Sequence, residues 1–134
     1  MKQFVTTLPR ALESVRAARQ LVDEHATGLT LQRRHDATVL VSELVTNALC
    51  HGRGEISLRI AHEPTALLIE VADEGDGKVE VSPTPGPFGG WGLRVIDELA
   101  NSWGSQAGST RVWVRLELDE PRTARRSQVE DSKP

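Results

Sequence analysis

The spacing of apolar residues predicts a short strand over residues 3–7, followed by two helices. Over residues 11–24, apolar side chains recur every three or four positions, which is the spacing of one buried helix face. The same spacing predicts a second helix over residues 31–50, which Gly52 and Gly54 end. The apolar positions are Ala11, Val15, Ala18 and Val22 in the first helix, and Ala37, Leu40, Val41, Leu44 and Ala48 in the second.

In the second half of the chain, apolar and polar residues alternate as they do in β-strands. Residues 56–60 and 111–118 carry apolar side chains at every second position, and residues 66–72 are apolar almost throughout, which favours a central strand. A short helix over residues 93–100 and a brief strand at Trp103 are predicted between them. This order predicts an α+β fold, a two-layer sandwich in which helices cover one face of a mainly antiparallel sheet.

Composition divides the chain into one domain and a tail. Hydrophobic residues make up 38% of the sequence, so residues 1–118 are expected to form a single domain with a buried core. Half of the residues in 119–134 are charged, and Val129 is the only large apolar residue there. Too little apolar surface remains in this segment to offset the entropy of ordering it, which predicts a disordered tail.

Charge and cysteine content exclude several classes of function. The net charge of −3 gives no general attraction to nucleic acid or to an anionic membrane, and no apolar run reaches membrane-spanning length. The Gly-Lys-Ser/Thr triplet of a Walker-type phosphate loop does not occur in the sequence. Cys50 is the only cysteine, which favours a reducing, cytoplasmic location.

Glu43 and Asn47 form the first candidate site. Four residues apart on the second predicted helix, they lie about 40° apart around its axis, at the edge of the apolar stripe. Burying a carboxylate and an amide costs free energy unless something pairs with them, and a hydrated Mg²⁺ would satisfy both. A Glu–Asn pair on a solvated helix edge has the same spacing, so both interpretations stay open.

The pattern Asp73-x-Gly75-x-Gly77 comes directly after the strand predicted over residues 66–72. A carboxylate at this position can accept hydrogen bonds from the amine of a bound base, and glycine lets the backbone approach a ligand closely. An ordinary acidic turn is the alternative. A calcium loop is disfavoured because the oxygen ligands that it requires do not continue downstream.

Two further segments contain groups that suit phosphate. Gly90-x-Gly92-Leu93 comes directly before a predicted helix, where free N–H groups attract anions. The dinucleotide-binding pattern is rejected there, because a proline-rich segment precedes it and Val95 stands in place of the last glycine. Thr110 and Arg111 precede the last strand; they offer a hydroxyl and a guanidinium to phosphate, or form only a hairpin turn.

Glu43-x-x-x-Asn47, Asp73-x-Gly75-x-Gly77 and Gly90-x-Gly92 occur in this order on the predicted elements. Together they resemble the histidine-kinase-type, or Bergerat-fold, ATPases over residues 3–118. The Ser-Glu-Leu-Val-Thr-Asn-Ala core and the closing Val-Trp-Val strand are similar to bacterial anti-sigma regulatory factors.

The resemblance implies ATP and Mg²⁺ as cofactors and gives each motif a role. Asn47 would ligate Mg²⁺, Glu43 would act as general base or polarise the nucleophile, and Asp73 would hold the adenine amine. The remaining residues would contact the nucleotide, with Gly75 and Gly77 at the base, Gly90, Gly92 and Leu93 near the phosphates, and Thr110 as a further binding residue.

The same resemblance implies a regulator of transcription. Such a protein binds a sigma factor and, with ATP, phosphorylates a serine or threonine on an anti-anti-sigma partner. No direct contact with nucleic acid or membrane is implied, and a second copy of the chain is a further candidate partner.

Departures from the family pattern leave a second hypothesis open, a non-catalytic switch that binds nucleotide and a partner. Residues 78–89 contain no arginine, Trp91 stands where relatives often have arginine, and Arg111 stands where they often have threonine. A histidine autokinase is disfavoured, because His35-Asp36 lacks the basic residue that usually follows an acceptor histidine, and no residues remain for a dimerising hairpin.

Overall fold

The computed structural model describes residues 2–75, 91–105, 110–118 and 129–130, with only the backbone at residues 91–93 and 129–130. Along the chain its elements are β1 (Lys2–Leu8), α1 (Glu13–His25), α2 (Leu31–His51), β2 (Ile56–His62), β3 (Ala66–Ala72), α3 (Trp91–Leu99), β4 (Ser102–Ser105), β5 (Val112–Glu117) and β6 (Val129–Glu130). The helices and strands predicted within these residues are all present, with boundaries that shift by one or two residues at most ends.

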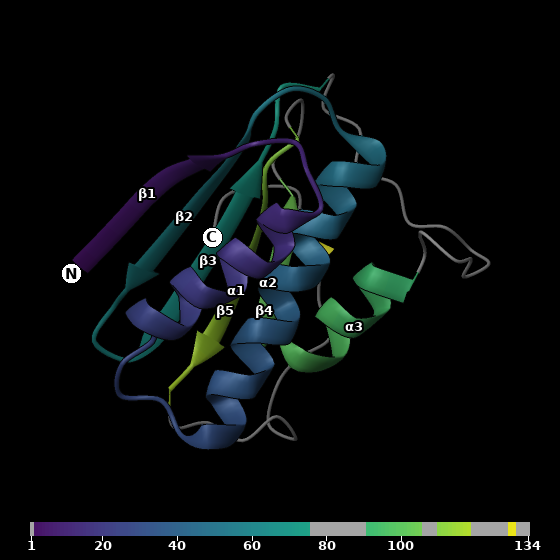
Figure 1. Cartoon of the computed structure of the whole chain (residues 1–134). Helices are drawn as coiled ribbons and strands as arrows, with labels where there is room; N and C mark the ends of the chain where they lie inside the picture. Colours follow the sequence, from purple (N-terminus) through teal and green to yellow (C-terminus); the bar gives the residue numbers. More distant parts are fainter. Residues whose placement is uncertain (1, 76–90, 106–109, 119–128, 131–134) are drawn as a thin grey trace.

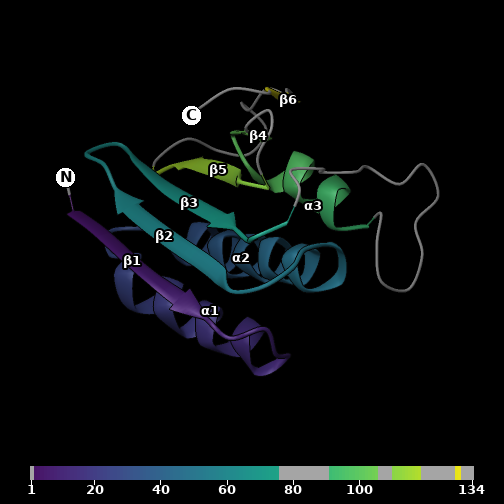
Figure 2. The ribbon, with the colours of Figure 1, turned by 90° about the horizontal axis from the view of Figure 1, so that it is seen from above.

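The strands form one sheet in the order β1-β2-β3-β5-β4-β6. Every pairing is antiparallel except that of β4 with β6. Figures 1 and 2 show the helices on one face of this sheet, which confirms the predicted α+β sandwich. Strand β3 lies inside the sheet and is buried along its whole length, as its apolar sequence predicted.

The core lies between the helices and the inner face of the sheet. Alternate residues of neighbouring strands point into it, as at the opposed pair Ile69 and Val114. The apolar faces of the helices pack against these strand residues. The helix residues in the core include Val22, Leu40, Val41 and Leu44. Removing these apolar surfaces from water is the main force that holds α2, and with it Glu43 and Asn47, against the sheet.

The N-terminal end of α2 is fixed by hydrogen bonds. The hydroxyl of Thr30 caps the helix by accepting from the backbone N–H of Arg33 at 3.1 Å. The buried guanidinium of Arg33 then donates to Oδ1 of Asn101 at 2.7 Å, and the same oxygen accepts from the N–H of Glu117 at 2.8 Å. This network ties the N-terminal end of α2 to β5.

The outer face of the sheet also buries apolar surface. Trp113 is 2% exposed and belongs to a small cluster with Ala61 and Leu68. The indole of Trp113 is therefore packed on the sheet and is not exposed to solvent. Beside this cluster, the buried carboxylate of Glu70 pairs with Arg59 at 3.3 Å and with Arg111 at 3.1 Å.

Two residues of the predicted tail, Val129–Glu130, form β6 on the open edge of β4. The rest of 119–134 lies outside the described residues, so its predicted disorder stays a prediction.

Candidate functional site

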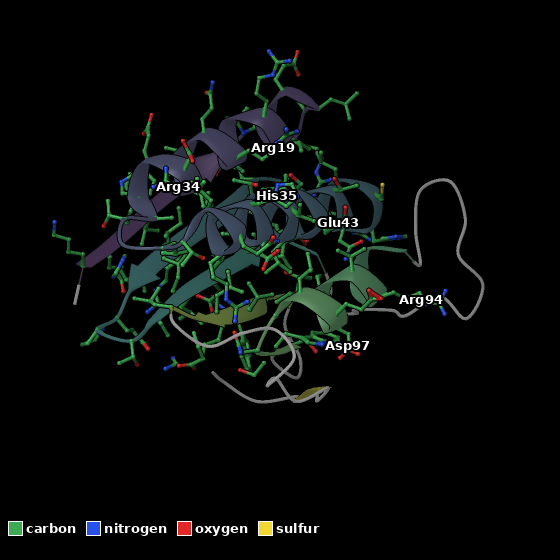
Figure 3. All side chains as sticks on the ribbon, turned by 90° about the horizontal axis from the view of Figure 1, so that it is seen from below. Arg19, Arg34, His35, Glu43, Arg94 and Asp97 are labelled. Atoms are coloured by element: carbon green, nitrogen blue, oxygen red, sulfur yellow. The ribbon has the colours of Figure 1, made fainter. Side chains whose placement is uncertain are left out.

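Helix α2 presents Glu43 and Asn47 together near its C-terminal end. Both side chains are partly buried, while Leu44 and Ala48, which flank Asn47 on the same turn, belong to the core. Figure 3 shows Glu43 on α2, with Arg19 on the neighbouring α1 and Arg94 on α3. Burial raises the pKa of the Glu43 carboxyl above its usual value, because low-polarity surroundings disfavour the charged form. The predicted edge position of this pair is confirmed.

The amide of Asn47 makes no hydrogen bond to another described residue. Its oxygen is therefore available to a hard cation such as Mg²⁺, which prefers oxygen ligands and keeps several of its waters. Among the described residues no group of three or more His, Cys, Asp or Glu side chains is placed to hold a metal ion. The residues present thus fit a metal that takes one protein ligand and most of its other ligands from phosphate and water.

Asp73 follows β3, and its carboxylate has two unlike oxygens. Oδ1 accepts hydrogen bonds from the backbone N–H of Gly75 at 2.6 Å and of Arg53 at 3.4 Å. Oδ2 has no hydrogen bond from a described residue and lies against Gly52. One oxygen thus fixes the orientation of the carboxylate, and no described residue donates a hydrogen bond to the other.

The loop that follows α2, residues 52–54, is the part of this site that the sequence analysis missed. A Cβ atom on Gly52 would overlap the Asp73 carboxylate, and one on Gly54 would overlap the side chain of Glu74. The carbonyl of Arg53 accepts a hydrogen bond from the N–H of Glu74 at 2.8 Å. Gly52 and Gly54 were interpreted only as the end of a helix, although two closely spaced glycines are also the signal of a close backbone approach.

Thr110 joins the start of β5 to the end of β3. Its hydroxyl donates to the carbonyl of Asp73 at 2.8 Å and accepts from the N–H of Asp73 at 3.0 Å. Arg111 pairs with Glu70 on the outer face of the sheet. Thr110 therefore places its hydroxyl beside Asp73, whereas Arg111 lies on the outer face of the sheet.

The structure brings only part of the predicted site together. Glu43 and Asn47 on α2 and Asp73, Gly75 and Thr110 at the end of β3 are described, whereas Gly77 and Gly90 lie outside the described residues. Helix α3 begins at Trp91, two residues earlier than predicted, so Gly92 lies in its first turn together with Leu93. First-turn N–H groups have no partner within their own helix, so the anion-binding argument for this segment still holds.

A family model described as histidine kinase-like ATPase domain matches residues 8–118. This range includes α2, the Asp73 turn and β5. The chain belongs to the histidine kinase-like ATPase family. Membership makes it an ATPase-type, ATP-binding domain, as the motifs predicted. No curated protein matches the chain.

This ATPase domain also has a cavity of about 300 Å³ at the opposite end of the sheet. Phe4 and His25, whose rings stack with centroids 4.2 Å apart, line it together with His62. None of the site residues that the structure describes lines this cavity. In the part of the chain that the structure describes, no helix is both long and apolar enough to span a bilayer.

Proposed function

We propose that this domain is an ATP-dependent protein kinase of the anti-sigma type, which phosphorylates a serine or threonine on an anti-anti-sigma partner and sequesters a sigma factor. One observation carries the proposal: a half-buried carboxylate with a raised pKa, Glu43, lies one helical turn from the amide of Asn47, which makes no hydrogen bond to another described residue. A carboxylate whose pKa moves toward neutrality is better suited to accept a proton than an exposed one.

The adenine end of the proposed site is the Asp73 carboxylate. Its Oδ2 would accept a hydrogen bond from the exocyclic amine of adenine, while Oδ1 stays bonded to Gly75 and Arg53. Gly75 lets Asp73 and Thr110 approach its backbone closely, because a Cβ atom there would crowd both side chains. Because Oδ2 of the Asp73 carboxylate can only accept a hydrogen bond, the site favours adenine, which presents an amine, over a base that carries a keto oxygen in the same place.

In the proposed transfer step, the partner's hydroxyl oxygen attacks the γ-phosphorus of ATP, the bond to the ADP oxygen breaks, and Glu43 accepts the hydroxyl proton. Asn47 would hold Mg²⁺ through its amide oxygen. The ion would supply positive charge next to the phosphate oxygens, which is the main electrostatic requirement of phosphoryl transfer. The N–H groups in the first turn of α3, at Gly92 and Leu93, would add to it.

The sigma factor, the anti-anti-sigma protein and the cytoplasmic location rest on the sequence resemblance and on the single cysteine, Cys50. The non-catalytic switch remains the second candidate. The observation that favours it is the lack of arginine in residues 78–89. The presence of Arg111 where relatives often have threonine does not support the switch, because Thr110 provides a hydroxyl beside Asp73.

Single-turnover transfer from labelled ATP to a co-purified protein substrate tests the proposal. Glu43→Gln keeps the size of the side chain and removes its basicity, so transfer should fall by about 10²–10⁴-fold while ATP affinity changes little. Glu24→Gln, an exposed change on α1, is the matched control. Equal transfer by wild type and Glu43→Gln would refute the catalytic role. Tight ATP binding without transfer by wild type to a confirmed partner would support the switch.

A further inference from the structure

Arg10, in the turn between β1 and α1, binds three backbone carbonyls around the C-terminal end of α2. Its Nη1 donates to the carbonyls of Ala48 at 2.9 Å and Leu49 at 3.0 Å, and its Nε donates to the carbonyl of Gly54 at 2.9 Å. The contacts therefore reach both the last turn of α2 and the far end of the loop that follows it. No sequence motif marked this residue.

The carbonyls at the end of a helix have no partner within the helix and carry partial negative charge. A guanidinium suits them because its donors are fixed in one plane and its charge is permanent. The carbonyl of Ala48 also accepts from the N–H of Gly52 at 2.9 Å, which closes the helix. Arg10 thus fixes the path of the chain where it leaves α2.

The loop held by Arg10 is the one that holds Asp73. Between the carbonyls of Leu49 and Gly54 lie Gly52, which packs against the Asp73 carboxylate, and Arg53, whose N–H donates to Oδ1. We propose that Arg10 is a positioning residue of the nucleotide site, which orients the Asp73 carboxylate through residues 52–54. This inference rests on the proposed role of Asp73 toward adenine and adds the residue that supports it.

Two nucleotides separate a positioning role from a merely structural one. ATP carries the amine that Asp73 would accept from, whereas inosine triphosphate (ITP) carries a keto oxygen there and gains nothing from a well-placed carboxylate. Loss of Arg10 should therefore weaken binding of ATP and leave binding of ITP unchanged. A general loss of folded protein would weaken both nucleotides by the same factor.

The experiment is calorimetric titration of wild type, Arg10→Ala, Arg10→Lys and Arg34→Ala with ATP and with ITP at fixed Mg²⁺. We expect Arg10→Ala to weaken ATP about tenfold, as expected for one hydrogen bond, with ITP changed less than about twofold. The ATP affinity of Arg10→Lys should lie between those of wild type and Arg10→Ala, because a lysine ammonium does not reproduce the planar set of donors of a guanidinium. Arg34→Ala removes an exposed pair with Asp23 near the other end of α2 and should change neither affinity.

Equal weakening of ATP and ITP, or unchanged ATP affinity, would overturn the positioning role. If Arg10→Ala does not fold, Arg10→Lys decides by the same comparison of ATP with ITP. Wild type that binds ATP and ITP equally would instead overturn the adenine role of Asp73, so the wild-type data test that proposal before any Arg10 variant is compared.

Discussion

Replacing Asp73 with asparagine reverses the hydrogen-bonding polarity at the proposed adenine contact. In the wild type, Oδ1 faces the N–H groups of Gly75 and Arg53, and Oδ2 faces Gly52 without a hydrogen bond from a described residue. An asparagine must keep its oxygen toward the two N–H donors, because an NH₂ group there would oppose them. Its NH₂ group then takes the position of Oδ2 and presents a donor where adenine also presents one.

The size of the effect follows from this single contact. A hydrogen bond to a charged group contributes about 1.5–3 kcal/mol, so ATP affinity should fall about 10- to 150-fold. ITP, whose keto oxygen can accept from the new NH₂ group, should bind Asp73→Asn at least as tightly as it binds wild type. The variant should therefore shift its preference from ATP toward ITP.

Calorimetric titration of both proteins with both nucleotides measures this shift. Asp23→Asn makes the same chemical change at an exposed site on α1 and should leave both affinities unaltered. Thermal denaturation of Asp73→Asn should accompany the titrations, since its bonds to Gly75 and Arg53 become neutral and weaker. Unchanged ATP affinity, or equal weakening of ATP and ITP in a fully folded variant, would refute the adenine assignment.

Two further predictions concern stability. Because burial raises the pKa of Glu43, ionised Glu43 destabilises the fold at pH values above that pKa but not below the ordinary glutamate pKa. Glu43→Gln should therefore melt above wild type at pH 7.5, with a gain that disappears by about pH 4; a pH-independent gain would contradict this. Gly52→Ala should destabilise by about 1–3 kcal/mol in urea titrations and weaken ATP, because its Cβ overlaps Asp73. Gly28→Ala, with φ +84° and open space around it, should affect only stability.

Much of this domain could be predicted from local sequence. The spacing of Leu40, Leu44 and Ala48 determines which face of α2 is buried, so the edge position of Glu43 and Asn47 followed directly. The continuous apolarity of residues 66–72 likewise indicated an interior strand. These are properties of neighbours along the chain, and the periods of helix and strand are sufficient to derive them.

The contacts that orient Asp73 join residues far apart in the sequence. Arg53 lies twenty residues before Asp73 and Thr110 thirty-seven after it, while Arg10 reaches Ala48 across thirty-eight. Which of Thr110 and Arg111 points to the site depends on the pairing of β5 with β3, in which Val112 lies opposite Val71. Periodicity identifies which face of an element is buried, but only packing and strand register decide which distant backbone group comes within hydrogen-bonding distance of a given carboxylate.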